Sequence, residues 1–277
     1  MPAALAPPSF DLSHLDVQAT AFLILFARVG TVLMLLPVFS EDAVPGRIRL
    51  LIALGMSIGL WGVLAPLMRT AAAAGGALPA VLLAELITGL AIGALVKIVF
   101  SAVSMAGSII SSQIGLSSAL LYDASQGGQA ALLSKFVTVA AAVVCMSLHV
   151  HHLWIGAIVE SYRTFPIGGM PPAHDFLRAA LDAVARAMTL GIGLSAPLLV
   201  YGIVFNVALG LSTRIAPAIQ LFFIVQPLNI LLGLAVMAMT LGGLLTGFAQ
   251  AMAAAARIVR IDREAGLDVR AAEIAIR

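Results

Sequence analysis

The sequence predicts an all-α integral membrane protein, from its composition and from the grouping of its apolar residues into long runs. Of 277 residues, 61% are hydrophobic and 10% are charged, and the mean hydropathy is +1.09. A soluble domain carries about 25% charged residues, so a water-soluble fold of this size could not cover this much apolar side chain. Only helices and closed barrels pair all their backbone groups within hydrocarbon. The runs are longer than the alternating segments of about ten residues that form barrels, which leaves helices.

Six runs meet the requirement of about 20 apolar residues for a membrane-spanning helix. In chain order they cover residues 17–39, 50–68, 78–110, 130–159, 189–211 and 218–249. The third would reach about 50 Å as a helix, so we expect it to tilt, kink or project beyond the bilayer. An amphipathic stretch, 176–188, leads into the fifth run, and Gln226-Pro227 interrupts the sixth. These runs predict about six long hydrophobic helices or helical hairpins in one membrane domain, 17–249.

The two ends of the chain differ from this membrane domain. Segment 1–16 contains Pro2, Pro7 and Pro8 and no basic region, so we expect the first run to be a retained signal anchor. Segment 250–277 carries nine of the 28 charged residues and is predicted to be a solvated helix. Six crossings would place both termini on one side, and the five arginines of the tail favour a cytoplasmic C-terminus.

Several functional classes are disfavoured by the residues that are missing. The single cysteine, Cys145, excludes a disulfide framework, and a net charge of +2 does not suggest nucleic-acid binding. Ser117 and Ser118 in GLSSA lack the spacing of a nucleophile elbow, and no zincin or Walker motif occurs, so we expect no enzyme. Only one carboxylate, Glu85, lies inside an apolar run. A proton-coupled carrier needs a titratable relay, so a small-solute transporter is an alternative with little support.

Ionisable residues inside a membrane span are costly and therefore face protein or water. Arg28 lies near the centre of the first run, and two interpretations are open: a buried ion pair or carbonyl clamp that holds helices together, or a residue lining a conduit. Glu85 and Lys97 are too far apart on one helix to pair with each other. Each needs a partner from another helix or another chain.

A group of histidines occupies the fourth run. His149 and His152 of the HVHH sequence share one helix face, as two metal ligands could, with His151 between them. No cysteine or carboxylate stands nearby to complete a ligand shell. We therefore expect a neutral, hydrogen-bonded cluster rather than a metal site, and no cofactor.

Small residues at GxxxG spacing allow helix backbones to approach closely. Three such pairs occur: Gly55/Gly59, Gly89/Gly93 and Gly243/Gly247.

Four motifs, in order from about residue 22 to 247, resemble the FliR family of the type III export gate. They are ARVGTVLMLLPVF with VPGRIR (Arg28, Pro37, Pro45, Arg49), ELITGLAIG (Glu85, Gly89, Gly93), HHLWIGAIVESYRTFPIGG (His151, His152, Ser161, Pro166, Gly168) and FNVALGLSTRIAP with QPL (Asn206, Gly210, Arg214, Pro217, Pro227). The chain departs from the family pattern at Ser118, Ala124, Ala218 and Gln226.

The resemblance implies FliP-like helices followed by a FliQ-like hairpin, wound with partner subunits into a helical, closed assembly. Much of that assembly would stand on the periplasmic side of the bacterial inner membrane, in the flagellar basal body. The implied partners are FliP, FliQ and FlhB, the lipid bilayer and exported unfolded flagellar proteins. An injectisome subunit of the same kind is the first alternative.

The resemblance also implies a channel plug after the third long helix, at 111–123; an ordinary interhelical loop is the alternative. Its core is Gly115, Leu116, Ser117, Ser118, Ala119, Leu120 and Leu121. Glycine permits tight turning and the leucines could fill a narrow lumen.

A second set of residues is expected to be buried and to hold helices in register: Arg28, Glu85, Lys97, His151, His152, Asn206 and Arg214.

Overall fold

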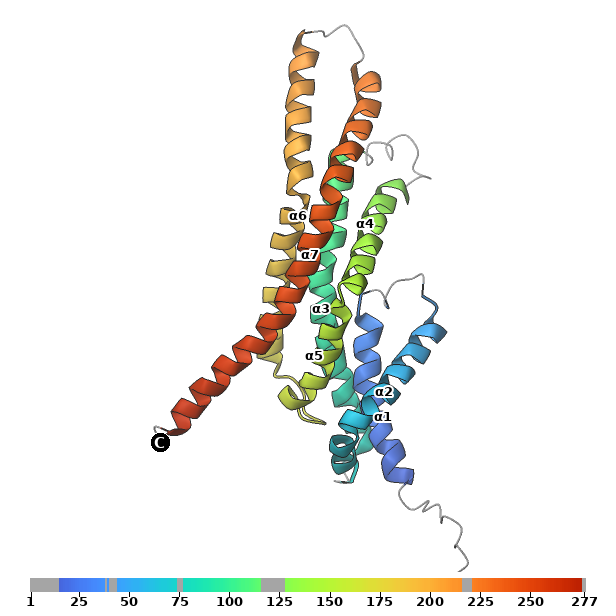
Figure 1. The fold of residues 1–277 in the computed structure, drawn as a ribbon, viewed down its shortest axis with the longest axis vertical. Helices are drawn as coiled ribbons and strands as arrows, with labels where there is room; N and C mark the ends of the chain where they lie inside the picture. Colours follow the sequence, from blue (N-terminus) through green and yellow to red (C-terminus); the bar gives the residue numbers. More distant parts are fainter. Residues whose placement is uncertain are drawn as a thin grey trace, which may run out of the picture. The chain divides into compact units, whose positions relative to one another are not determined.

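A computed structural model describes residues 15–37, 39, 44–73, 77–115, 128–215 and 221–275, and these ranges contain seven helices and no strand (Figure 1). The helices are α1 (Leu15–Leu35), α2 (Gly46–Ala73), α3 (Leu78–Ile114), α4 (Gly128–Ser147), α5 (Val150–Thr164), α6 (Ala173–Ile215) and α7 (Leu221–Ala275). Five are long and apolar enough to cross a membrane, and α4 with α5 would make a sixth span. The predicted all-α membrane fold is therefore confirmed.

The fourth apolar run is not one helix, as predicted, but two. Helices α4 and α5 are bent by 75° at the break between them. His149 lies in this break with a φ of 58°, in the left-handed region that ends helices. The sequence prediction missed the break because neither glycine nor proline marks it. Histidine is among the non-glycine residues that adopt this conformation most often.

The last two runs extend further than predicted. Helix α6 joins the amphipathic stretch 176–188 to the fifth run and continues through Pro197. Helix α7 continues through Gln226-Pro227 and includes most of the charged tail, which is therefore not a separate element. Proline is tolerated inside membrane helices because neighbouring groups satisfy the backbone atoms that it frees. At about 1.5 Å per residue, α6 is about 65 Å long and α7 about 80 Å.

The chain forms two compact units, each described by itself. The first unit comprises Met1–Ala94 and Ile158–Phe176. In it, α1 packs against α2, and Phe22 meets Trp61 edge to face at 5.7 Å. A Cβ at Gly89 would lie 2.8 Å from the carbonyl oxygen of Arg28, and one at Gly93 would lie 2.8 Å from Cβ of Leu35. The Gly89/Gly93 pair thus brings α3 into close contact with α1.

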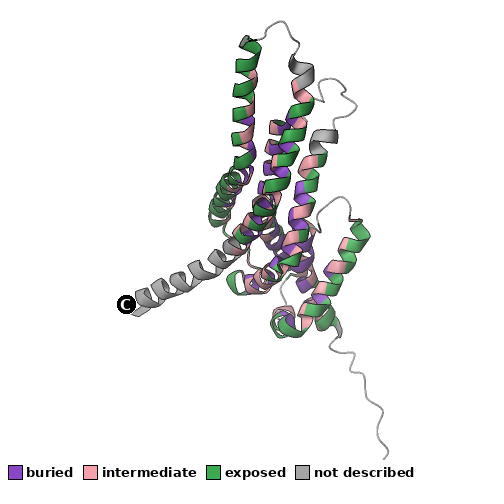
Figure 2. Ribbon diagram, turned by 45° about the horizontal axis from the view of Figure 1, so that its top comes forward, coloured by how far each residue is buried: buried purple, intermediate pink, exposed green. Residues whose placement is uncertain are grey.

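The second unit comprises Leu95–Ala157 and Leu177–Arg277. The C-terminal half of α3 is its core, with Val103, Ala106 and Ile110 fully buried (Figure 2). Two glycines again mark close contacts. A Cβ at Gly107 would lie 2.7 Å from Cα of Ser134 on α4, and one at Gly191 of α6 would lie 3.0 Å from the carbonyl oxygen of Ala102.

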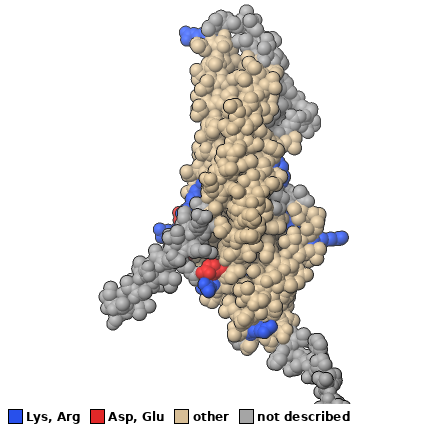
Figure 3. Space-filling view, in the orientation of Figure 1, with Lys and Arg blue, Asp and Glu red and all other residues tan. Residues whose placement is uncertain are grey.

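Helix α6 exposes apolar side chains along most of its length in this unit. The visible face of the molecule is correspondingly poor in charged groups (Figure 3). The largest exposed residues recur mostly at intervals of three or four, with a gap between 192 and 200: Leu177, Leu181, Val184, Met188, Ile192, Val200, Ile203, Val204, Val207 and Leu211. We call this set the α6 stripe.

Candidate functional site

Arg28 forms a completely buried ion pair with Glu85 in the first unit. Its Nε donates to Oε2 of Glu85 at 2.7 Å and its Nη2 donates to Oε1 at 2.9 Å. Neither side chain has any exposed surface. Two parallel hydrogen bonds between a guanidinium and a carboxylate are the strongest and most directional form of such a pair. Helices α1 and α3 are joined at this point.

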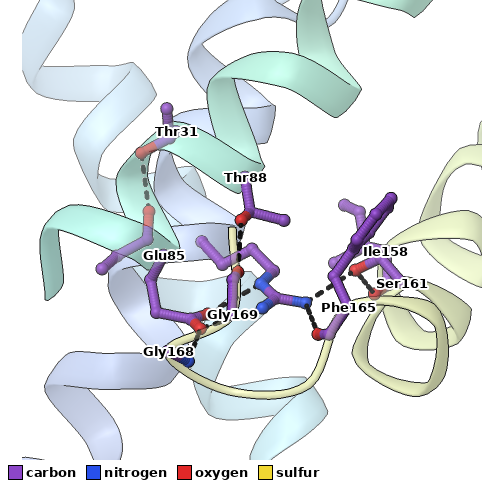
Figure 4. A network of polar contacts seen from close by, with 10 residues as sticks. Thr31, Glu85, Thr88, Ile158, Ser161, Phe165, Gly168 and Gly169 are labelled. Atoms are coloured by element: carbon purple, nitrogen blue, oxygen red, sulfur yellow. Dashed lines mark hydrogen bonds and ion pairs between the residues drawn. The ribbon is translucent and has the colours of Figure 1, made fainter. Parts of the chain in front are cut away.

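The remaining polar atoms of the pair bind the end of α5 and the turn that follows it (Figure 4). Nη1 of Arg28 donates to the carbonyl oxygen of Phe165 at 3.0 Å and to Oγ of Ser161 at 3.4 Å. The guanidinium carbon lies 4.1 Å from the centroid of the Tyr162 ring, in a cation–π contact. We call these residues, with Glu85 and Gly168, the Arg28 centre.

The turn after α5, residues 166–169 with the sequence PIGG, binds Glu85; we call it the PIGG turn. The N–H of Gly168 donates to Oε1 of Glu85 at 3.0 Å, and the N–H of Gly169 closes the turn on the carbonyl of Pro166 at 2.9 Å. Gly168 has a φ of 75°, a conformation that a side chain would strain. Thr88 adds a weak bond, at 3.3 Å, from its hydroxyl to the carbonyl oxygen of Gly169. Hydrogen bonds with Glu85 and Thr88 thereby attach the PIGG turn to α3.

This geometry distinguishes between the two interpretations of Arg28. It is a buried ion pair and a carbonyl clamp together, whereas lining a conduit requires an accessible side chain. Burying two charges is costly, and their attraction offsets that cost only when the geometry is good and further hydrogen bonds satisfy the other polar atoms. The Arg28 centre meets both conditions. Glu85 finds its partner on another helix of the same chain.

The other five residues of that set are exposed or half-buried in this chain, so their role in holding helices in register stays a prediction. Lys97 is exposed on α3, Arg214 is exposed near the end of α6, and Asn206 is exposed and donates only to the carbonyl of Gly202 in its own helix, at 2.8 Å. His151 is half-buried and His152 is exposed. Helices that are apolar on every face do not reveal from sequence which side faces the core.

The histidine cluster exists as packed rings at the helix break. The ring centroids of His151 and His152 are 4.3 Å apart, and those of His149 and His152 are 5.5 Å apart. The buried Nδ1 of His151 has no hydrogen-bond partner within the described part of the chain. Among the described residues, no three His, Cys, Asp or Glu side chains are arranged to hold a metal ion.

Of the predicted plug, only its start is described. Residues 111–114 belong to the last turn of α3 rather than to a loop, and Gly115 follows with a φ of 85°. The carbonyl oxygen of Gly115 accepts a hydrogen bond from Nε2 of Gln226 at 2.9 Å. Residues 116–123, including Leu116, Ser117, Ser118, Ala119, Leu120 and Leu121, lie outside the described residues.

Sequence reasoning missed three polar residues: Tyr162 of the Arg28 centre, and Tyr201 and Asn229, which hydrogen-bond to each other near Gly115. Tyr162 follows Ser161 within the third motif, and the other two are polar groups inside apolar runs. A polar side chain in a membrane span was the signal that could have found Tyr201 and Asn229.

Comparisons with known proteins identify relatives over most of the chain. The sequence profile of "Bacterial export proteins, family 1" matches residues 19–255. The flagellar biosynthetic protein FliR of Caulobacter vibrioides is 37% identical over 239 residues, covering 83% of this chain and 94% of the relative. FliR of Escherichia coli is 30% identical over 230 residues, covering 82% and 85%. FliR of Bacillus subtilis is 26% identical over 220 residues, covering 76% and 82%.

Proposed function

Because this chain belongs to the family of bacterial export proteins, we propose that it is a core subunit of the flagellar type III protein export gate. As a FliR-like protein it is a membrane-embedded component of the flagellar export apparatus. With FliP, FliQ and FlhB it would form the channel through which unfolded flagellar proteins cross the inner membrane. Other components would supply the energy, and the chain itself would catalyse no reaction.

The α6 stripe is the observation that carries this proposal. It extends from Leu177 to Leu211, about 50 Å along the helix, whereas the hydrocarbon core of a bilayer is about 30 Å thick. Only 17% of the most apolar stretch of α6 is buried within the chain. Lipid can cover part of this surface, and other protein helices must cover the rest. A subunit of a larger helical assembly has this requirement, whereas a carrier that works alone does not.

We place the assembly in the inner membrane, with part of it projecting to the periplasmic side and the C-terminus in the cytoplasm. A stripe longer than the bilayer supports the projection, and the five tail arginines support the cytoplasmic C-terminus. Segment 17–249 would be the membrane domain, FliP-like helices followed by a FliQ-like hairpin. The Arg28 centre would keep α1, α3 and the PIGG turn in register inside it.

Segment 111–123 would seal the resting channel. The proposal rests on the resemblance of GLSSA and its neighbours to the family's plug and on the apolar leucines in this segment. In the assembled gate, deletion of residues 114–121 is expected to let ions and small molecules leak across the membrane. A membrane barrier unchanged by that deletion would contradict the plug.

Co-expression with FliP and FliQ, followed by native mass spectrometry in detergent, tests the subunit proposal. We expect a stable hetero-oligomer that contains this chain. A monodisperse chain that binds neither partner would exclude the gate and favour the small-solute transporter instead. Restoration of motility in a flagellar export mutant would separate the flagellar role from the injectisome alternative.

A further inference from the structure

In the second unit, the last turn of α3 packs against glycines of α6 and α7. The Gln113 side chain occupies the space where Gly202 of α6 would carry a Cβ. A Cβ at Gly233 of α7 would lie 2.7 Å from Cγ1 of Ile114. The last turn of α3 therefore fits closely between α6 and α7, because both helices lack a side chain at the contact.

Two amide side chains of α7 bind the backbone at this helix end, and a tyrosine of α6 binds one of them. Nε2 of Gln226 donates to the carbonyl oxygen of Gly115 at 2.9 Å, and Nδ2 of Asn229 donates weakly to that of Gln113 at 3.5 Å. The Tyr201 hydroxyl lies 2.7 Å from Oδ1 of Asn229 and 3.0 Å from its carbonyl oxygen, and donates to them. We call Tyr201, Gln226 and Asn229 the amide clamp.

The clamp does the work of a helix cap. The last carbonyls of a helix have no partner within it and must be satisfied by other groups. Just after α3, the N–H of Gly115 donates to the carbonyl of Ser112 at 3.2 Å. The two α7 amides satisfy the carbonyls of Gln113 and Gly115. Tyr201 orients the Asn229 amide by occupying its oxygen, which directs the NH₂ group toward α3.

Gly115 is required for this approach. A Cβ there would lie 2.7 Å from Nε2 of Gln226 and 2.9 Å from Nδ2 of Asn229, and its φ of 85° disfavours any side chain. At the end of α3 the backbone thus adopts a glycine conformation, with the two amides packed against it.

We propose that the amide clamp is a positioning device of the export gate: it holds the end of α3 in the closed state and releases it when the gate opens. This inference rests on the proposed function. The clamp contains no charge, and each neutral hydrogen bond contributes modestly to stability, so it can open without leaving a buried ion. Tyr201 and Gln226 are only half-buried, which leaves the clamp within reach of competing hydrogen-bond partners. An unfolded polypeptide carries such donors and acceptors on every residue.

Two measurements on the gate assembled with its partners test this. The variant is Gln226→Met, which keeps the length of the side chain and removes the donor; the matched control is Gln250→Met, an exposed glutamine of the same helix. At equal amounts of assembled gate, Gln226→Met should increase both ion leak through reconstituted vesicles and amide hydrogen exchange of residues 109–115 by about fivefold, the change expected from one ordinary hydrogen bond. Gln250→Met should change neither.

The outcomes separate the clamp from the plug. Faster exchange with unchanged leak would show that the amides cap α3 without positioning a closed gate, and would overturn the inference; so would no change in either. If deletion of residues 114–121 leaks and Gln226→Met does not, the clamp fails while the plug stands. If the deletion does not leak, the plug fails and the inference with it. Should Gln226→Met not assemble, Gln226→Glu, which has the same shape and cannot donate as a carboxylate, replaces it.

Discussion

The Arg28 centre and the amide clamp do similar work in different units by different chemistry. Both attach side chains of one helix to backbone carbonyls beyond it. The Arg28 centre uses a charged pair with no exposed surface, whereas the clamp uses neutral amides and a phenol, two of them half-buried. A charged pair is a permanent attachment, and a neutral one can be released.

The energies of the two interactions support this distinction. Removing one partner of a buried ion pair leaves an uncompensated charge, at a cost of about 3–5 kcal/mol. Removing one neutral hydrogen bond costs about 1 kcal/mol. Loss of either charge of the Arg28 centre should therefore strongly destabilise the fold, while variants of the clamp should leave a folded chain with altered function.

The largest effect is expected from Arg28→Met. It removes both bonds to Glu85 and the bond to the Phe165 carbonyl, and leaves a carboxylate buried. We expect a loss of about 3–5 kcal/mol, measured as a lower thermal unfolding midpoint and less protein in the membrane.

A double variant sharpens that test. In Arg28→Met/Glu85→Leu no charge stays buried, so it should be less destabilised than Arg28→Met alone. A double variant as unstable as the sum of the two single variants would mean that the ion pair is not what holds the first unit together. Arg47→Met, at an exposed arginine of the same unit, serves as the control for loss of a positive charge.

Gly89→Val should produce the next largest effect. Its Cβ would lie 2.8 Å from a backbone oxygen of Arg28, which cannot move without shifting the helix that carries the ion pair. Overpacking of this kind costs about 1–3 kcal/mol. Gly55→Val is the matched control, since nothing lies within 4 Å of that position in this chain. Equal loss of thermal stability in both variants would argue against close α1–α3 packing as the cause.

Tyr162 allows its ring to be tested apart from its hydroxyl. The ring contacts Arg28, but the buried hydroxyl has no hydrogen-bond partner within the described part of the chain. Tyr162→Phe should therefore leave thermal stability unchanged or raise it slightly, whereas Tyr162→Leu should lose the cation–π contact, about 2 kcal/mol when desolvated. Destabilisation by Tyr162→Phe would indicate that the hydroxyl binds a water or a partner subunit.

The fold class was accessible from the sequence because it follows from solvation: long apolar runs need helices in lipid. Solvation also indicated that Glu85 needs a partner and that Arg28 could form an ion pair, but no pattern paired the two residues with each other. The break at His149 was not accessible, because neither glycine nor proline stands where the backbone turns into the left-handed region. The continuity of α6 and α7 was missed because proline and charge look like boundaries in sequence, yet neither ends a helix here.

The faces of the helices were the part that sequence could not give. In a soluble helix the polar side marks the outside, but these helices are apolar all round, so Lys97, Asn206 and Arg214 could not be separated from Arg28 by pattern. The amide clamp was missed for the same reason. Its residues come from two helices, α6 and α7, and only the folded chain brings them together at Gly115, where a third helix ends.

The smallest effect is expected at Asn206, and it extends the comparison to two residues of one type. Asn229 is 8% exposed and links Tyr201 to the end of α3, whereas Asn206 is exposed and donates to the carbonyl of Gly202 in its own helix. Asn206→Ala should change the stability of the isolated chain by no more than about 0.5 kcal/mol, the usual range for a surface position. Asn229→Ala should cost about 1–3 kcal/mol, because it removes the side-chain acceptor of the Tyr201 hydroxyl and leaves the carbonyl oxygen of Gln113 without its amide donor. Thermal unfolding of each variant, alone and with FliP and FliQ, compares them.

If Asn206→Ala lowers thermal stability little in the isolated chain but as much as Asn229→Ala in the assembly, then Asn206 holds helices in register across a subunit interface. If it is as damaging alone, burial in this chain is not what separates the two asparagines.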